Sequence, residues 1–131
     1  MYRIFCSLFF LPLAASAGTT IYTDSQHLPV NTPDGVRVVL LDAPEQLQNR
    51  FFGSLPADAD KAEAVVRARM QSPEWQMMQA ELAAHYRDVA HAWSLGVKKY
   101  PAVVFDDSEV VYGITDVVVA GKLRTEGGVQ P

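Results

Sequence analysis

The fold is decided by GVKKYPAVVFDDSEVVYG, residues 96–113. Gly96 can end a preceding helix in a left-handed conformation, and Pro101 precedes a run of apolar residues. Two aspartates and a serine then separate that run from a second one, as in a strand–turn–strand unit. A strand accepts proline at its first position, where the missing N–H is not needed. The stretch therefore predicts a β-hairpin that is entered through Tyr100 and Pro101.

Two further strands are predicted near the start of the chain. β-Branched and aromatic residues favour strands at 19–23 and 36–41, and a connection rich in proline and glycine joins them at 24–35. The nearly continuous apolar run at 36–41 is typical of a strand covered on both faces in the middle of a sheet. A parallel pairing of the two strands needs a crossover of about a dozen residues, which this connection just supplies.

Several helices are predicted between the second strand and the hairpin, and one after the hairpin. Asp42 is expected to cap the first, which runs towards residue 52, and the next is expected over 58–70. The longest, from Pro73 to about Ser94, has an apolar stripe that we expect to lie on the sheet. The stripe consists of Trp75, Met78, Leu82, Tyr86, Val89 and Trp93. The last helix begins at Thr115 or Asp116.

The N-terminus has the pattern of a secretory signal peptide. A short basic start is followed by an apolar run at 4–13 and by small residues that end at Ala17. The alternative is an ordinary buried helix. We predict a signal peptide over 1–17, one domain over 18–125 and a flexible tail over 126–131.

Removal of the signal peptide would change the chemistry of the chain. Cleavage after Ala17 would leave 114 of the 131 residues and remove Cys6, the single cysteine. The formal charge would change from −4 to −5, because Arg3 is removed as well. An acidic chain is poorly suited to nucleic acid, whose binding depends on phosphate neutralisation. The basic residues at 67–69 and 98–99 are interpreted as solvated charges at helix ends.

The hairpin and the order of the elements resemble the thioredoxin fold. The proline that precedes an apolar strand, the closing Gly113 and the helix behind them carry this resemblance. It implies an α/β domain with a small mixed sheet of about four strands flanked by helices, and a cis Tyr100–Pro101 bond.

Several short motifs resemble an exported family of integrating conjugative element proteins. The motifs are Ile21–Asp24, Leu41-Asp42, Leu55-Pro56, Gly96-Val97, Pro101–Asp106, Val110–Gly113 and Thr115-Asp116. That family accompanies a type IV secretion-like transfer apparatus and has no established catalytic activity. The resemblance implies a periplasmic location and partners among the proteins of a conjugative transfer apparatus.

The chain departs from the redox pattern of thioredoxin-like enzymes. Those enzymes place two cysteines after the first strand, where the start of a helix stabilises the thiolate. Here the segment reads DSQHL at 24–28. Thiol–disulfide exchange requires an attacking sulfur, so a dithiol mechanism is excluded for the mature chain acting alone. We expect no cofactor and no catalytic residue.

Two enzymatic alternatives stay open. Ser25, His27 and Asp24 have the residue types of a hydrolytic triad, although a triad is defined by geometry and not by sequence proximity. Alternatively, the domain could be a thioredoxin-like subunit that borrows the thiols of a partner. The three histidines, His27, His85 and His91, lack the spacing of metal ligands, so we predict no metal site.

The preferred function is protein binding at a groove beside the proline. Thioredoxin-like domains without cysteines can retain this groove, and strand addition is a familiar mode of peptide recognition. The candidate surface consists of Tyr22, His27, Leu28, Tyr100 and Pro101. The sequence therefore predicts a redox-inactive, periplasmic accessory or assembly protein of a conjugative transfer system, of open oligomeric state and with no stable membrane span after cleavage.

Overall fold

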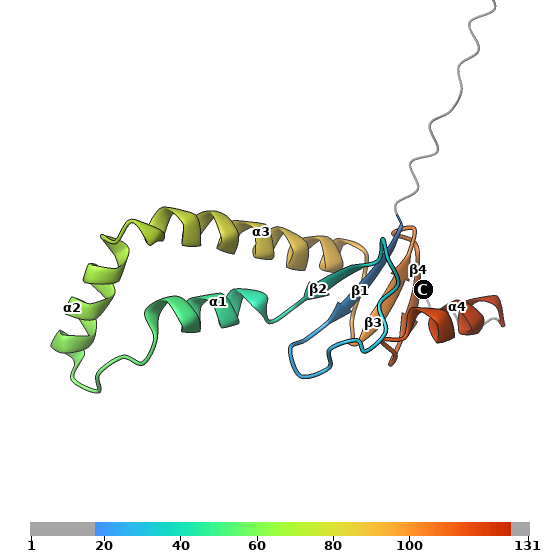
Figure 1. Cartoon of the computed structure of the whole chain (residues 1–131), viewed down its shortest axis with the longest axis horizontal. Coiled ribbons are helices and arrows are strands. Elements are labelled where there is room, and N and C mark those ends of the chain that lie inside the picture. The colour runs from blue at the N-terminus through green and yellow to red at the C-terminus, as the bar shows by residue number, and fades with distance from the viewer. Residues whose placement is uncertain (1–17, 127–131) are drawn as a thin grey trace, which may run out of the picture.

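The computed structural model describes residues 18–126 as strands and helices joined by short loops (Figure 1). The elements are β1 (Thr19–Thr23), β2 (Arg37–Leu40), α1 (Ala43–Phe52), α2 (Ala59–Met70), α3 (Glu74–Ser94), β3 (Ala102–Phe105), β4 (Glu109–Tyr112) and α4 (Val117–Thr125). This succession confirms the predicted order of two strands, several helices, a hairpin and a last helix. The predicted signal peptide lies outside the described residues, as does the predicted tail apart from Glu126.

The four strands form one mixed sheet in the order β2-β1-β3-β4. β1 pairs with β2 in parallel, and β3 pairs in antiparallel with both β1 and β4. The Tyr100–Pro101 peptide bond is cis, as predicted. The predicted fold class is thus confirmed: this is a small mixed α/β fold consistent with a thioredoxin-like domain.

The expectation that the second strand lies in the middle of the sheet is wrong. β2 is an edge strand, and of its residues only Val39 is buried. The segment between β1 and β2 contains no helix, so no helix from this connection covers the outer face of β2. A strand with this apolar sequence could lie in the middle of the sheet or at its edge, and the sequence alone therefore could not separate the two positions.

Each face of the sheet carries its own buried cluster. On one face, Tyr22, Val39, Ala102, Val104 and Val110 pack with Ala92 of α3. On the other, Ile21, Val103, Phe105 and Val111 pack with Ala120 of α4. Both alanines are at most 1% exposed. Because their side chains are small, the two helices can approach the sheet closely.

Only the C-terminal end of α3 lies on the sheet, which corrects the prediction for its apolar stripe. The rest of α3 reaches away from the strands and runs beside α1, with α2 at the far end (Figure 1). Trp75 packs against Phe51 and Phe52, at 5.6 and 6.2 Å between ring centroids. Trp93 is 77% exposed, because the neighbouring Ala92 takes the position against the sheet.

Two of the predicted helix starts have side-chain caps, and the cap at Asp116 was one of the two expected for the last helix. The Asp58 carboxylate accepts a hydrogen bond from the Lys61 backbone N–H at 3.0 Å. The Asp116 carboxylate accepts from the N–H groups of Val118 and Val119, at 2.9 and 3.1 Å. These bonds satisfy donors that have no partner inside the helix. No helix among residues 18–126 combines the length and apolarity needed to span a bilayer.

Candidate functional site

A groove of about 260 Å³ lies between the C-terminal end of α3 and the loop that leads into β3. It is lined by Leu41, Val89, Ala92, Trp93, Val97, Lys98, Lys99 and Tyr100, and we call it the aromatic–lysine groove. Its aliphatic residues are buried or half-buried and form the floor. Its aromatic and cationic residues are exposed and form the rim. The groove lies next to the cis peptide bond of Tyr100 and Pro101.

The rim exposes two large aromatic side chains. Trp93 is 77% exposed and Tyr100 is 55% exposed. Beside them, neither the Lys98 nor the Lys99 ammonium forms an ion pair with a carboxylate of the described residues. Tryptophan and tyrosine are the residues that most often dominate binding energy at protein interfaces. The rim therefore has the composition of a recognition surface.

The local sequence fixes the shape of the groove through the end of α3. Gly96 has a φ of +76°, which glycine adopts without steric cost. Its N–H donates to the Trp93 carbonyl at 3.0 Å, and the Val97 N–H donates to the Ala92 carbonyl at 3.1 Å. This pair of bonds is a Schellman motif. It turns the chain back so that Val97 packs on the same cluster as Ala92.

Tyr112 of β4 holds the other side of this turn. Its hydroxyl donates to the Gly96 carbonyl at 3.3 Å and accepts from the Lys98 backbone N–H at 3.3 Å. The Pro101 carbonyl accepts from the Gly113 N–H at 2.8 Å. The loop that carries both lysines is therefore held at its two ends by hydrogen bonds to the hairpin. A surface organised in this way loses little entropy when it binds.

The structure places the five predicted surface residues in different parts of the molecule. Tyr100 lines the groove, and Pro101 is half-buried beside it. Tyr22 is 1% exposed and belongs to the core, so the prediction that its side chain forms part of a surface is wrong. Burial raises the pKa of its phenol, and the Asp107 carboxylate adds to this effect. Tyr22 lies on a central strand, where the face covered by α3 excludes solvent.

His27 and Leu28 are exposed on the loop after β1, and neither is among the described residues that line the groove. The His27 Nδ1 atom lies 2.6 Å from Asp24 Oδ1. This hydrogen bond holds the pKa of the Asp24 carboxyl below its usual range. The loop also forms a tight turn, in which the His27 N–H donates to the Asp24 carbonyl at 3.2 Å.

Ser25 does not complete a triad with His27 and Asp24. Its hydroxyl donates to the Asp42 carboxylate at 2.5 Å and accepts from Gln46 Nε2 at 3.1 Å. Asp42 also accepts from the Ser25 backbone N–H at 3.1 Å. The expectation that the Asp42 side chain caps α1 is therefore wrong, because this carboxylate is used by the loop after β1.

The match to known proteins is at the level of a family. A family model described as "Protein of unknown function (DUF1525)" matches residues 16–126. The chain belongs to the DUF1525 family. No curated protein and no solved structure matches it. The DUF1525 match spans every described residue, and it therefore includes the aromatic–lysine groove.

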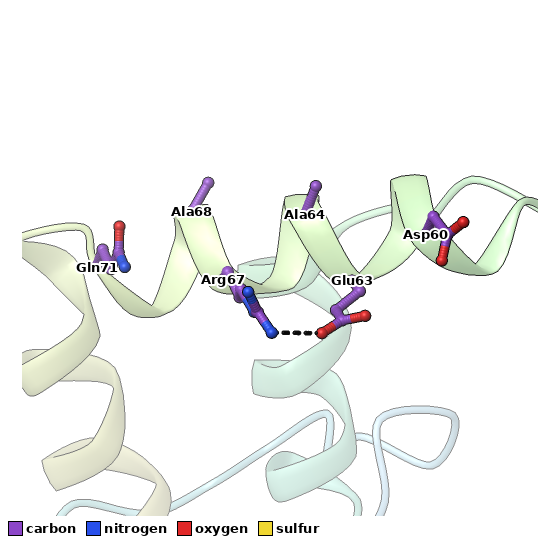
Figure 2. Close-up of a pocket in the computed structure, with 6 residues that line it drawn as sticks. All are labelled: Asp60, Glu63, Ala64, Arg67, Ala68 and Gln71. Atoms are coloured by element: carbon purple, nitrogen blue, oxygen red, sulfur yellow. Dashed lines mark hydrogen bonds and ion pairs between the residues drawn. The ribbon is translucent and has the colours of Figure 1, made fainter.

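Two other hollows of this DUF1525 chain share no residue with the aromatic–lysine groove. One, of about 310 Å³, lies between α1 and α3 and is lined by Ser25, Leu40, Ala43, Gln46, Arg50, Glu81 and His85. The other is a face of α2 alone, where Figure 2 shows Asp60, Glu63, Ala64, Arg67, Ala68 and Gln71 along one helix. No second element encloses that face. Residues 18–126 contain no cluster of three or more side chains placed to hold a metal ion.

Sequence reasoning missed three rim residues of the DUF1525 groove. Trp93 was expected in the core, and Lys98 and Lys99 were interpreted as solvated charges. A signal was present, because a second stripe with helical spacing runs through Met78, Leu82, His85, Val89 and Ala92. That stripe ends on a small residue, which suits close contact with a sheet, and it leaves Trp93 to one side.

Proposed function

We propose that this chain is a redox-inactive, periplasmic accessory or assembly protein of an integrating conjugative element transfer system, and that it acts by binding a protein of the type IV secretion-like apparatus. The system and the location rest on the resemblance of the motifs and on the signal-peptide pattern. The mode of action rests on the aromatic–lysine groove.

The observation that carries the proposal is the exposure of Trp93 and Tyr100 on a groove that is already formed. Each side chain leaves more than half of its surface in water. Exposed aromatic residues beside an aliphatic floor favour association, because their burial removes apolar surface from water. The hydrogen bonds of Gly96, Val97 and Tyr112 hold this arrangement before a partner arrives.

Two features support a role without redox chemistry. The single cysteine, Cys6, falls within the predicted signal peptide. The connection at 24–36, where a thioredoxin-like enzyme would start its first helix, has no helix. Of the enzymatic alternatives, hydrolysis by Ser25 and His27 loses support because the Ser25 hydroxyl is engaged by Asp42. A subunit that borrows the thiols of a partner is the remaining alternative.

The proposal is tested by complementation in a donor strain that carries such an element. The gene is deleted, and conjugation frequency is measured after restoring the wild type, Trp93→Ala or Tyr100→Ala. We expect both variants to reach the periplasm in normal amounts and to lower the transfer frequency at least tenfold. The matched control is Tyr86→Ala, which removes a tyrosine that is 51% exposed on α3 but does not line the groove.

Two outcomes would count against the proposal. Normal transfer after deletion of the gene would remove the assignment to the transfer system. Equal effects of Tyr86→Ala and Tyr100→Ala would remove the assignment to the groove. Purified apparatus proteins then identify the partner, through a complex that forms with the wild type and not with Trp93→Ala.

A further inference from the structure

We propose that the aromatic–lysine groove takes an acidic segment of a protein partner, in which an aliphatic or proline side chain is flanked by Asp or Glu. This inference rests on the proposed function and specifies the chemistry of the bound segment. It has two parts: the apolar floor selects the anchoring side chain, and the lysines select the charge of its neighbours.

The charge argument begins with the lining of the groove. Lys98 and Lys99 are the charged residues that line it, and no carboxylate does. Acidic groups of the adjoining elements have other partners, and Asp42, next to Leu41 in the chain, accepts from the Ser25 hydroxyl. The Asp88 carboxylate lies 2.6 Å from the Arg37 guanidinium, and the Asp107 carboxylate lies 3.5 Å from the Nε2 atom of His91. The groove is therefore locally positive in a chain whose formal net charge is −4.

The apolar argument comes from the size and walls of the groove. A volume of about 260 Å³ is below the range of about 300–1,000 Å³ typical of sites that enclose a whole small molecule. It suits the anchoring side chain of a longer ligand. Leu41, Val89 and Val97 supply aliphatic contacts, and Trp93 and Tyr100 supply aromatic faces on which proline packs well.

The two parts together favour an extended acidic segment over a basic or neutral one. Acidic residues on either side of the anchor would meet the two ammonium groups, and a basic segment would be repelled. The attraction is weakened by salt, since exposed charges are screened over about 8 Å at physiological ionic strength. The net negative charge of the whole chain opposes an acidic partner at long range, so recognition depends on this local positive charge.

The first experiment is an unbiased selection. A random peptide library displayed on phage is selected on protein purified from the periplasm of an expression host, and in parallel on Trp93→Ala. We expect sequences enriched on the wild type alone to carry Asp or Glu beside Pro, Leu, Ile or Val. Enriched sequences that depend on Trp93 but are neutral or basic would overturn the acidic inference and leave protein binding at the groove intact.

The second experiment measures the contribution of the lysines. In a Trp75→Phe background, Trp93 is the single tryptophan and reports binding of a selected acidic peptide by fluorescence. We expect Lys98→Glu with Lys99→Glu to weaken binding about tenfold or more, since each exposed ion pair contributes up to about 1 kcal/mol. The control pair Lys61→Glu and Lys122→Glu, on α2 and α4, should leave the affinity within about twofold.

These outcomes separate the inference from the proposed function. Affinity that is unchanged by the Lys98 and Lys99 reversals, or by raising the salt concentration, would overturn the acidic inference alone. Absence of any enriched sequence that depends on Trp93 would overturn both, because the groove would then bind no peptide. The selection on Trp93→Ala gives this second result directly.

Discussion

The two tryptophans of this chain should contribute very differently to its stability, and the structure gives the size of the difference. Trp93 is 77% exposed. An aromatic side chain can bury about 250 Å², so at about 25 cal/mol per Å² the buried part of Trp93 contributes at most about 1.5 kcal/mol. Trp93→Ala should therefore lower the free energy of unfolding by less than about 1.5 kcal/mol, against about 3–5 kcal/mol for a tryptophan in a core.

Trp75 is the internal control for this prediction. Its ring packs against Phe51 and Phe52, and aromatic pairs contribute about 0.5–1.5 kcal/mol each beyond their buried area. Trp75→Ala should cost about 2–3 kcal/mol, because the side chain is half-buried and joins α3 to α1. Both variants are measured by urea unfolding followed by far-ultraviolet circular dichroism, which does not depend on the missing fluorophore.

A loss of 3 kcal/mol or more in Trp93→Ala would refute the reasoning. It would mean that the apolar stripe expected from the sequence packs on the sheet through Trp93, and that Ala92 does not hold that position. Equal losses in the two variants would have the same meaning. The expected result would also validate Trp93→Ala as a folded variant for the binding experiments.

Three further predictions concern the hairpin turn and the loop after β1. Asp106→Gly should stabilise the protein by about 0.5 kcal/mol in urea unfolding, because Asp106 has a φ of +50°, which is strained for a non-glycine residue. The strain relieved in the folded state should exceed the cost of the entropy that glycine adds to the unfolded chain. A loss of stability would contradict this prediction. The pKa of the Asp24 carboxyl should lie below 3.8 in carbon-detected NMR, so the contribution of Asp24 to the stability of the fold is present above the unfolded pKa and is lost as the pH falls through the lower folded pKa. In His27→Ala the pKa of Asp24 should rise towards 3.8. An unchanged pKa in this variant would count against the hydrogen bond. Ser25→Ala should lower the free energy of unfolding by about 1 kcal/mol in thermal unfolding, because Asp42 loses a hydrogen bond. It should leave any ester hydrolysis by the purified protein unchanged. Hydrolysis abolished by this substitution would restore the enzymatic alternative.

Much of the fold was predictable because the signals that begin and end its helices and strands are local in the sequence. Gly96 ends α3, acidic residues mark the starts of α2 and α4, and two apolar runs around a polar turn form the hairpin. Each of these signals depends on a few neighbouring residues. The position of β2 at the edge was not predictable, because it depends on which strand pairs with β3 and on the absence of a covering helix.

The candidate site was predictable only in part, for a related reason. Tyr100 and Pro101 were found because the proline marks the start of the hairpin. Trp93 was missed because helical spacing allows two overlapping stripes, and the choice between them depends on how closely α3 approaches the sheet. Tyr22 was misplaced because a strand residue next to a loop in sequence can still face a helix that arrives much later in the chain.

The loop between β1 and β2 differs from the redox segment of thioredoxin-like enzymes in its backbone as well as in its residues. Reactive cysteines owe their low pKa to the positive end of a helix or to a neighbouring cation. This segment has no helix, and its Asp24 and Asp42 carboxylates hold the chain through His27 and Ser25. Cysteines placed at positions 24 and 27 would remove the Asp24–His27 pair, but they would still lack the helix N-terminus that lowers the pKa of a thiol. Redox chemistry of the thioredoxin type at this position would therefore require a helix start after β1 as well as two cysteines.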